Sequence, residues 1–517
     1  MPSTLSYPGV YIEEIPSGVR TITGVATSVT AFIGRAPQGL VSEPITINNF
    51  GDFERQFGGL SLNYPMSYAV RDFYLNGGSQ ALIVRLFKDD SSTGTPGPNA
   101  QVTLNELILV ASSPGQWGNN LKVSINYDGI TQEVADRYHL AITDLFNLVV
   151  TYGGSGLEKI PNLSVVEGTR RIDRVLQQES SWLRVGASPL PTARPAIVSG
   201  AIVEGGRSGG ALGDADYLGS EANKTGLYAL KKADLFNLLC IPPDTRDGST
   251  SPSVYQAAMQ FCYDHRAMVI VDSPASWGSN KETAAMAARD GLTNLGLSGV
   301  AARNAALYFP RVIQADPLRE GQLDTFVPCG IVAGVMSRID TQRGVWKAPA
   351  GLDAALNGIQ GLQVNLTDPE NGMLNPLGIN CLRSFPVNGR VLWGARTLRG
   401  ADQLADEYKY LPVRRFVLYM EESLYRGTQW VVFEPNDEPL WSQIRLNIGA
   451  FMNNLFRQGA FQGKSPKDAY FVKCDSETTT QNDINLGIVN IVVGFAPLKP
   501  AEFVVIKFQQ MAGQIAT

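Results

Sequence analysis

Few residues of this chain stand at spacings that support acid–base or metal chemistry. The two histidines, His139 and His265, lie far apart, and neither is near a second metal ligand or a nucleophile. The five cysteines are odd in number and form no CxxC pair, which fits neither a disulfide framework nor a zinc site. We therefore expect structural histidines, reduced core cysteines, and no bound metal.

One stretch resembles a nucleotide-binding loop but lacks its required glycine. Gly463, Lys464 and Ser465 match the end of a P-loop, yet Gln458 occupies the earlier glycine position and Pro466 follows where a helix should continue. The glycine-rich residues 205–213 fit no dinucleotide-binding frame and suit a linker. No cofactor is expected.

Asp272 keeps an enzymatic alternative open. It follows the apolar run Met268–Val271, at the position where open α/β sheets place ligand-binding groups. No partner group accompanies it in the sequence, so the competing interpretation is an aspartate that caps the loop Ser273–Ala275. We expect a protein that is not an enzyme, with an α/β enzyme working near Asp272 as the alternative.

Composition narrows the classes of partner. A chain of 517 residues exceeds what one hydrophobic core supports, so two or more domains are expected. A net charge of −5 does not fit a broad basic surface for nucleic acid. No signal peptide is visible, and the longest apolar stretch, 487–498, is interrupted by Asn490 and too short to cross a bilayer. We expect neither nucleic acid binding nor direct membrane insertion.

Alternating apolar runs and helical patterns predict the fold class. Runs at 235–241, 268–271 and 305–309 are separated by helical patterns at 254–265 and 282–303, the rhythm of a parallel sheet. The predicted chain is a mixed α/β (α+β) multidomain protein, with an α/β core, a mostly β inserted domain, and extended β arms at both ends.

Loop-forming stretches mark the expected limits between domains. The expected domains are an N-terminal arm at 1–22, core segments at 23–90 and 220–400, an inserted, variable, mostly β domain at 91–219, a C-terminal domain at 401–500 and an arm strand at 501–517.

The C-terminal part combines one amphipathic helix with strand-like runs. The helix is expected at 440–458, begun by Asp437 and ended at Gly459. Strands are expected at 415–420, 488–495 and 503–508. The apolar face of the helix consists of Trp441, Ile444, Ile448, Phe451, Met452 and Leu455.

Several longer stretches resemble one protein family. They are Tyr7–Glu14, Asn304–Pro310, Gly334–Val335 with Arg343–Ala350, Leu374–Asn380, Glu421–Trp430, Phe433–Trp441, Thr480–Ile484 and Pro500–Phe503. These stretches are similar to the contractile tail sheath proteins of phages and phage-like injection particles. The resemblance covers residues 1–90 and 220–517, whereas 91–219 fits only loosely.

The resemblance implies a structural subunit that forms six-membered rings stacked as a helical sleeve around an inner tube. On triggering, such a sleeve shortens and drives the tube through a target cell envelope. The implied partners are further copies of this chain, an inner tube protein, and baseplate and tail-terminator or cap proteins. The implied location is a phage virion tail or a contractile injection particle assembled in the bacterial cytoplasm, with residues 91–219 on the outside. A tail-tube or baseplate protein is the other structural alternative.

The two ends of the chain are predicted to pair with neighbouring copies. A proline-fenced strand near the N-terminus and an alternating run near the C-terminus have backbone groups that another chain can satisfy by strand addition. The candidate arm residues are Val10, Tyr11, Ile12, Glu13, Ile15, Ile488, Val489, Ile491, Val493, Phe503, Val504, Val505, Ile506 and Phe508.

The helix at 440–458 resembles the element that faces the inner tube in this family. Its polar side leaves candidates for contact with an acidic tube surface, and the alternative is a solvated face. The candidates are Gln443, Asn454, Arg457, Lys464 and Lys467.

Overall fold

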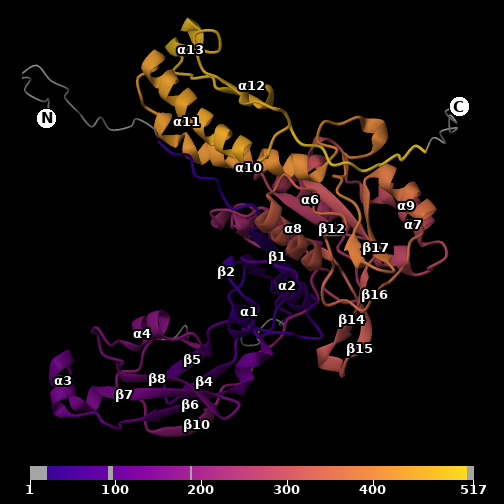
Figure 1. Cartoon of the computed structure of the whole chain (residues 1–517). Coiled ribbons are helices and arrows are strands. Elements are labelled where there is room, and N and C mark those ends of the chain that lie inside the picture. Colours follow the sequence, from indigo (N-terminus) through magenta and orange to yellow (C-terminus); the bar gives the residue numbers. More distant parts are fainter. Residues whose placement is uncertain (1–19, 91–96, 187–188, 509–517) are drawn as a thin grey trace, which may run out of the picture. The chain divides into compact units, whose positions relative to one another are not determined.

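The computed structural model describes residues 20–90, 97–186 and 189–508, which belong to two compact units (Figure 1). The core unit comprises Ser28–Arg338 and Pro349–Asp406. The C-terminal unit comprises the described residues up to Thr27, together with Ile339–Ala348 and the chain from Glu407. The candidate arm residues Val10, Tyr11, Ile12, Glu13 and Ile15 lie outside the described residues.

An eight-stranded sheet forms the centre of the core unit. The strand order is β18 (Gly389–Leu392), β17 (Ile379–Phe385), β13 (Ala305–Phe309), β12 (Met268–Asp272), β11 (Leu238–Cys240), β1 (Thr30–Gly34), β3 (Ala81–Arg85) and β2 (Ile45–Ile47). All strands from β17 to β3 run parallel, and the two edge strands are antiparallel. The predicted parallel sheet is confirmed.

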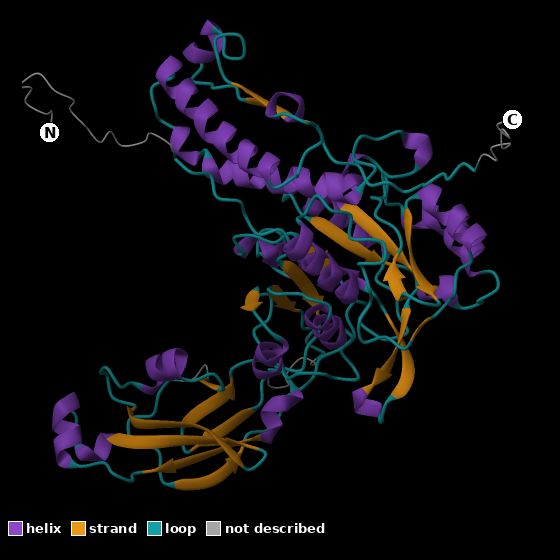
Figure 2. Cartoon of the chain, viewed as in Figure 1, coloured by secondary structure: helices purple, strands orange, loops and turns teal. Residues whose placement is uncertain are grey.

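Helices cover both faces of this sheet (Figure 2). Ala31 and Ile33 of β1 share a hydrophobic cluster with α6 (Pro252–Asp264) and α7 (Ala284–Gly291). Phe32, which points the other way, meets Phe73 of α2 (Met66–Leu75) at a ring distance of 5.6 Å. Burial on both faces explains why the strands read as unbroken apolar runs.

The helix α8 (Cys329–Arg343) packs unusually close to α2. A Cβ at Gly330 would overlap the carbonyl oxygen of Ala69, and one at Gly334 would overlap that of Phe73. The remaining elements of the α/β part are α1 (Phe50–Phe57), α5 (Asp214–Leu218), α9 (Asp368–Leu374) and a small sheet of β14 (Val312–Asp316), β15 (Gln322–Phe326) and β16 (Gly361–Leu362).

The inserted part of the core unit is mostly β, as predicted. One antiparallel sheet contains β4 (Gln101–Leu104), β5 (Leu107–Ala111) and β9 (Leu183–Val185), and another contains β10 (Val198–Ile202), β6 (Leu121–Asn126), β7 (Leu145–Tyr152) and β8 (Ser155–Ser164). With α4 (Ile172–Glu179), these sheets enclose a hydrophobic cluster of their own. The short helix α3 (Gln132–Tyr138) belongs to the same part.

The C-terminal unit is built on two long helices, α10 (Leu411–Gly427) and α11 (Glu438–Arg457). Asp437 begins α11 by accepting a hydrogen bond from the Glu438 backbone N–H, and all six residues of the predicted apolar face are buried. The unit also contains α12 (Pro466–Ala469), α13 (Gln481–Asn485) and an antiparallel pair of strands, β19 (Tyr470–Lys473) and β20 (Val492–Phe495).

One strand prediction in this unit is wrong, and another is confirmed only in part. Residues 415–420 lie inside α10, because a helix buried on most sides shows no clear helical period. In the run 488–495 only Val492–Phe495 forms a strand. Residues 503–508 have no strand assignment in the described chain.

Candidate assembly interface

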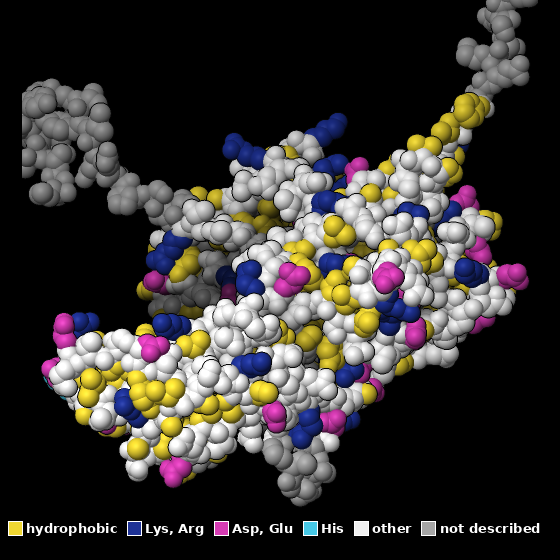
Figure 3. All heavy atoms as spheres, turned by 90° about the horizontal axis from the view of Figure 1, so that it is seen from below, with side chains coloured by type: hydrophobic (Ala, Val, Ile, Leu, Met, Phe, Trp, Pro, Cys, Tyr) yellow, Lys and Arg dark blue, Asp and Glu magenta, His cyan; other side chains and the backbone are white. Residues whose placement is uncertain are grey.

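The described chain ends in an exposed apolar run, residues 503–508. Phe503 is 75% exposed, Val505 77% and Phe508 94%. Figure 3 shows these residues as yellow spheres along an extended stretch of chain. Soluble monomers rarely expose contiguous large apolar side chains, so the run is a candidate contact for another molecule.

The base of this run is fastened to the C-terminal unit. The Tyr410 hydroxyl donates a hydrogen bond to Glu502 Oε2 at 3.2 Å, directly before the exposed residues begin. Any motion of the run relative to its own unit therefore starts after Glu502.

The strand pair β19–β20 is an incomplete sheet in the same unit. Two-stranded ribbons are marginally stable alone, and their outer edges carry backbone groups without ladder partners. Packing against α11 supports β19. Both strands keep exposed side chains, with Phe471 of β19 51% exposed and Val492 of β20 44% exposed.

The candidate arm residues before 503 have a different environment. Val489, Ile491 and Val493 pack against the hydrophobic cluster of their own unit, and Ile488 is 42% exposed. Their role in contacts with another copy stays a prediction.

The last described residues of the predicted N-terminal arm, 20–22, and the segment after them are held on the C-terminal unit. The Arg20 backbone N–H donates to Asn447 Oδ1 at 2.9 Å, and its guanidinium lies 4.4 Å from the centre of the Trp430 ring. Ile22 is buried, and the Val25 backbone N–H donates to Ser423 Oγ at 3.2 Å. This part of the predicted arm therefore contacts its own subunit.

The tube-facing candidates form an exposed polar surface on and beyond α11. Gln443, Asn454, Arg457, Lys464 and Lys467 are all exposed. Within the part of the chain that the structure describes, the three cations have no ion-pair partner, so their charge is available to an acidic surface.

A buried ion pair strengthens the C-terminal unit. Arg415 of α10 donates to both carboxylate oxygens of Asp340, at 2.9 and 2.6 Å, and to the Thr27 carbonyl oxygen at 2.9 Å. Both side chains are 3% exposed. Burial raises the pKa of Asp340, and the positive charge of Arg415 opposes that shift.

Asp272 caps a helix rather than the loop predicted from the sequence. Its Oδ1 accepts a hydrogen bond of 2.9 Å from the backbone N–H of Cys329, the first residue of α8. Its Oδ2 has no hydrogen-bond partner in the described residues. Burial raises the pKa of Asp272 to about 7, although Cys329 and the nearby charge of Arg311 lower it.

The position where an open α/β sheet most often binds a ligand is filled by an ion pair. That position lies beyond the carboxyl ends of β1 and β11, where the strand order reverses. Arg35 follows β1 there and donates to Asp244 at 2.5 and 2.9 Å. The guanidinium therefore engages both carboxylate oxygens of Asp244.

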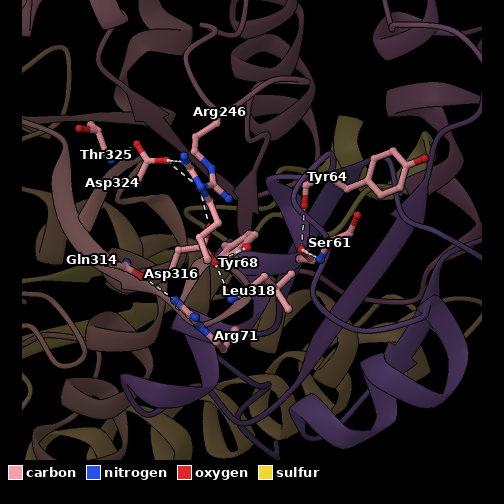
Figure 4. Close-up of polar contacts among 12 residues, drawn as sticks. Ser61, Tyr64, Tyr68, Arg71, Arg246, Gln314, Asp316, Leu318, Asp324 and Thr325 are labelled. Atoms are coloured by element: carbon pink, nitrogen blue, oxygen red, sulfur yellow. Dashed lines mark hydrogen bonds and ion pairs between the residues drawn. The ribbon is translucent and has the colours of Figure 1, made fainter. Parts of the chain in front are cut away.

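A second polar network joins α2 to the β14–β15 hairpin (Figure 4). The Tyr68 hydroxyl donates to Asp316 Oδ1 at 2.8 Å, and Arg246 bridges Asp316 and Asp324 at 2.7 Å each. Burial raises the pKa of Asp316, but hydrogen bonds from Arg246 and Tyr68 outweigh it and hold the pKa below its usual value. Paired carboxylates of this kind stabilise packing.

His265 and the five cysteines pack within the protein, whereas His139 is exposed. His265 Nδ1 lies 2.8 Å from the Phe261 carbonyl oxygen, and the imidazole stacks on the Phe261 ring. All five cysteines are buried and free. Among the residues described, no three His, Cys, Asp or Glu side chains are grouped so that they could hold a metal ion. No described helix has the length and apolar character needed to span a membrane.

A mixed α/β chain with an incomplete sheet and an exposed apolar end fits the class of self-assembling structural proteins. Two family models match this chain: the phage tail sheath protein central domain over residues 210–398 and the phage tail sheath C-terminal domain over residues 405–511. Together they cover more than half of the sequence. The chain belongs to the phage tail sheath family, which confirms the resemblance inferred from the sequence.

A curated relative agrees with this assignment. The tail sheath protein of Vibrio phage KVP40 is 26% identical over 180 residues, or 35% of this chain. The match spans only 26% of the length of that relative.

Solved structures share the fold over nearly the whole chain. The sheath complex of the extracellular contractile injection system PVC, in its contracted state, is 22% identical, with a TM-score of 0.58 and 98% of both chains covered. The contracted helical sheath of the anti-feeding prophage is 23% identical, with a TM-score of 0.57, and the match covers 98% of this chain and 100% of that one. The sheath tail protein of Listeria innocua is 13% identical, with a TM-score of 0.61 and coverage of 92% and 96%.

Proposed function

We propose that this chain is the subunit of a contractile sheath that polymerises around an inner tube and shortens to drive the tube through a target cell envelope. The observation that carries the proposal is the exposed apolar run 503–508 in a unit whose β19–β20 sheet is incomplete. Membership of the phage tail sheath family supports it.

The run of one copy would complete the β19–β20 sheet of an adjacent copy. An added strand with about four to six backbone hydrogen bonds, each with a net value of about 0.5–1.5 kcal/mol, contributes several kcal/mol. Burial of Phe503, Val505 and their neighbours adds to that value. Such a tether can persist while weaker contacts between subunits rearrange.

The N-terminal arm would provide a second tether. The contacts of Arg20 and Ile22 with their own unit would anchor the base of that arm. With two tethers per copy, subunits arranged in stacked rings of six could move nearly as rigid bodies during contraction. The domain limits predicted from the sequence belong to this proposal.

The other proposed partners are the inner tube, a baseplate and a terminator or cap protein. Arg457, Lys464 and Lys467 would face an acidic tube surface, with Gln443 and Asn454 contributing hydrogen bonds. The particle would be assembled in the bacterial cytoplasm, as a phage tail or an injection particle. Catalysis has no part in the proposal, because Asp272 caps α8 and Asp244 is paired with Arg35.

Truncation after Glu502 tests the tether. We expect tubular polymers from the full chain in negative-stain micrographs and discrete soluble particles from the truncated chain. The matched control is Lys507→Val, which keeps the run apolar and should polymerise. Circular dichroism should report the same folded content for all three proteins, because the run is exposed. Normal tubes from the truncated chain would overturn the proposed C-terminal tether. Normal sleeves from a chain lacking residues 1–15 would overturn the N-terminal tether.

A further inference from the structure

A groove of about 820 Å³ in the core unit takes no part in the contacts proposed above. One wall comes from residues 38–40 and the end of α1, and the other comes from the inserted part, at Trp117, Tyr152 and Trp182. Its volume lies within the range of roughly 300–1,000 Å³ found for small-molecule sites.

Three aromatic side chains line one wall of the groove and contact one another. The centres of the Tyr152 and Trp182 rings lie 6.2 Å apart, and their planes are inclined by 32°. The Trp117 ring lies 5.6 Å from that of Trp182. Tyr152 is 37% exposed although it lies at the end of a strand in a well-packed domain. An open aromatic wall of this kind is typical of a surface that stacks on a ligand.

Trp117 contributes its ring and not its polar group to the groove. The side chain is 7% exposed, and its indole nitrogen is buried without a hydrogen-bond partner among the described residues. A ligand in the groove would therefore contact the apolar ring of Trp117.

Both walls are held in place before any ligand binds. The buried Arg85 side chain donates to the carbonyl oxygens of Ala36 at 2.9 Å and Gly39 at 2.6 Å on one wall. It also donates to the Pro114 carbonyl oxygen at 2.7 Å on the other. The Gly39 backbone N–H donates to Ser113 Oγ at 3.1 Å. A preformed groove loses little entropy on binding.

The rim of the groove carries charges of both signs. Glu54 and Arg55 of α1 stand on one side, and Arg184 of β9 stands on the other. Arg55 is paired with Asp52, and Arg184 donates to the Ser180 carbonyl oxygen at 2.7 Å. Because this mixed rim has no strong field of one sign, it does not favour a polyanion such as nucleic acid. A lipid chain would offer no hydrogen-bonding groups to Glu54 and Arg184.

We propose that this groove binds a neutral oligosaccharide. A pyranose has one face of C–H groups, which would stack on Tyr152 and Trp182, and a ring of hydroxyls, which would reach Glu54 and Arg184. The site gives the inserted part of the chain a recognition function, independent of polymerisation.

Titration of the full chain with cellotriose, maltotriose and chitotriose, followed by saturation-transfer NMR, tests the site. We expect at least one trisaccharide to bind at millimolar concentration, and Tyr152→Ala and Trp182→Ala each to weaken it about tenfold, in keeping with the loss of a stacking partner. Tyr263→Ala is the matched control, because Tyr263 is also 37% exposed but lies on α6. It should bind normally.

Three results would overturn the inference. They are no binding of any of the three sugars, binding that survives both groove substitutions, and equal loss with Tyr263→Ala. A synthetic peptide of residues 501–508 that occupied the groove while the sugars did not would assign it to a chain segment instead. Negative-stain micrographs of Tyr152→Ala should show normal tubes, which keeps this test separate from that of the sheath proposal.

Discussion

The buried pair of Asp340 and Arg415 gives the sharpest prediction about stability. Asp340→Ala leaves the Arg415 guanidinium buried with only the Thr27 carbonyl oxygen as a partner. Removing one member of a buried pair typically destabilises a protein by about 3–5 kcal/mol, because the remaining charge stays out of water. That is a large part of the roughly 5–15 kcal/mol that stabilises most domains.

The double variant Asp340→Leu with Arg415→Met separates charge from packing. Apolar side chains of similar volume in place of a buried pair are often neutral in stability, so the double variant should recover most of the loss. The assay is urea unfolding of the C-terminal unit by tryptophan fluorescence, on a chain truncated after Glu502 so that polymers do not interfere. Equal losses in the single and double variants would refute the reasoning, since packing alone would then explain both.

Three further predictions concern single residues and surface charges. Asp272 has a folded-state pKa of about 7, above its unfolded value of 3.8, so its contribution to stability falls as pH rises toward 7. The free energy of unfolding of Asp272→Asn, relative to that of the wild type, should therefore rise by about 3 kcal/mol between about pH 5 and pH 8. Unfolding midpoints of the two proteins that change with pH in the same way would contradict this. Gly334→Val should lower the free energy of unfolding by at least about 2 kcal/mol, because its side chain would overlap the Phe73 carbonyl oxygen. Gly449→Val, whose side chain would enter open space, should lower it far less. Replacement of both Arg457 and Lys464 by Glu should abolish co-sedimentation with the inner tube, whereas replacement of the exposed Lys122 by Glu should not. Unchanged co-sedimentation of the Arg457 and Lys464 variant would favour a solvated face.

The sequence predicts elements whose burial leaves a periodic trace. The strands β11, β12 and β13 read as apolar runs because both of their faces are covered. The helix α11 has one apolar face and a capping Asp437, so its limits agree with the structure to within two residues. By contrast, α10 is buried at most positions of its first half, and its run of Phe416, Val417 and Leu418 resembles a strand.

Contacts between distant residues could not be predicted in the same way. Asp272 caps a helix that begins far along the chain at Cys329, and a single sequence contains no signal for that pairing. The glycines of α8 lower its helix propensity, although they are the residues that let it approach α2. The groove wall combines Gly39, Trp117, Tyr152 and Trp182, which only the fold brings together.

Hydrogen exchange at residues 503–508 tests the central claim most directly. If an adjacent copy's sheet accepts this run, its amides should exchange slowly in assembled tubes, at rates like those of β19 and β20, and rapidly in dissociated chains. Rapid exchange of these amides within intact tubes would contradict the account.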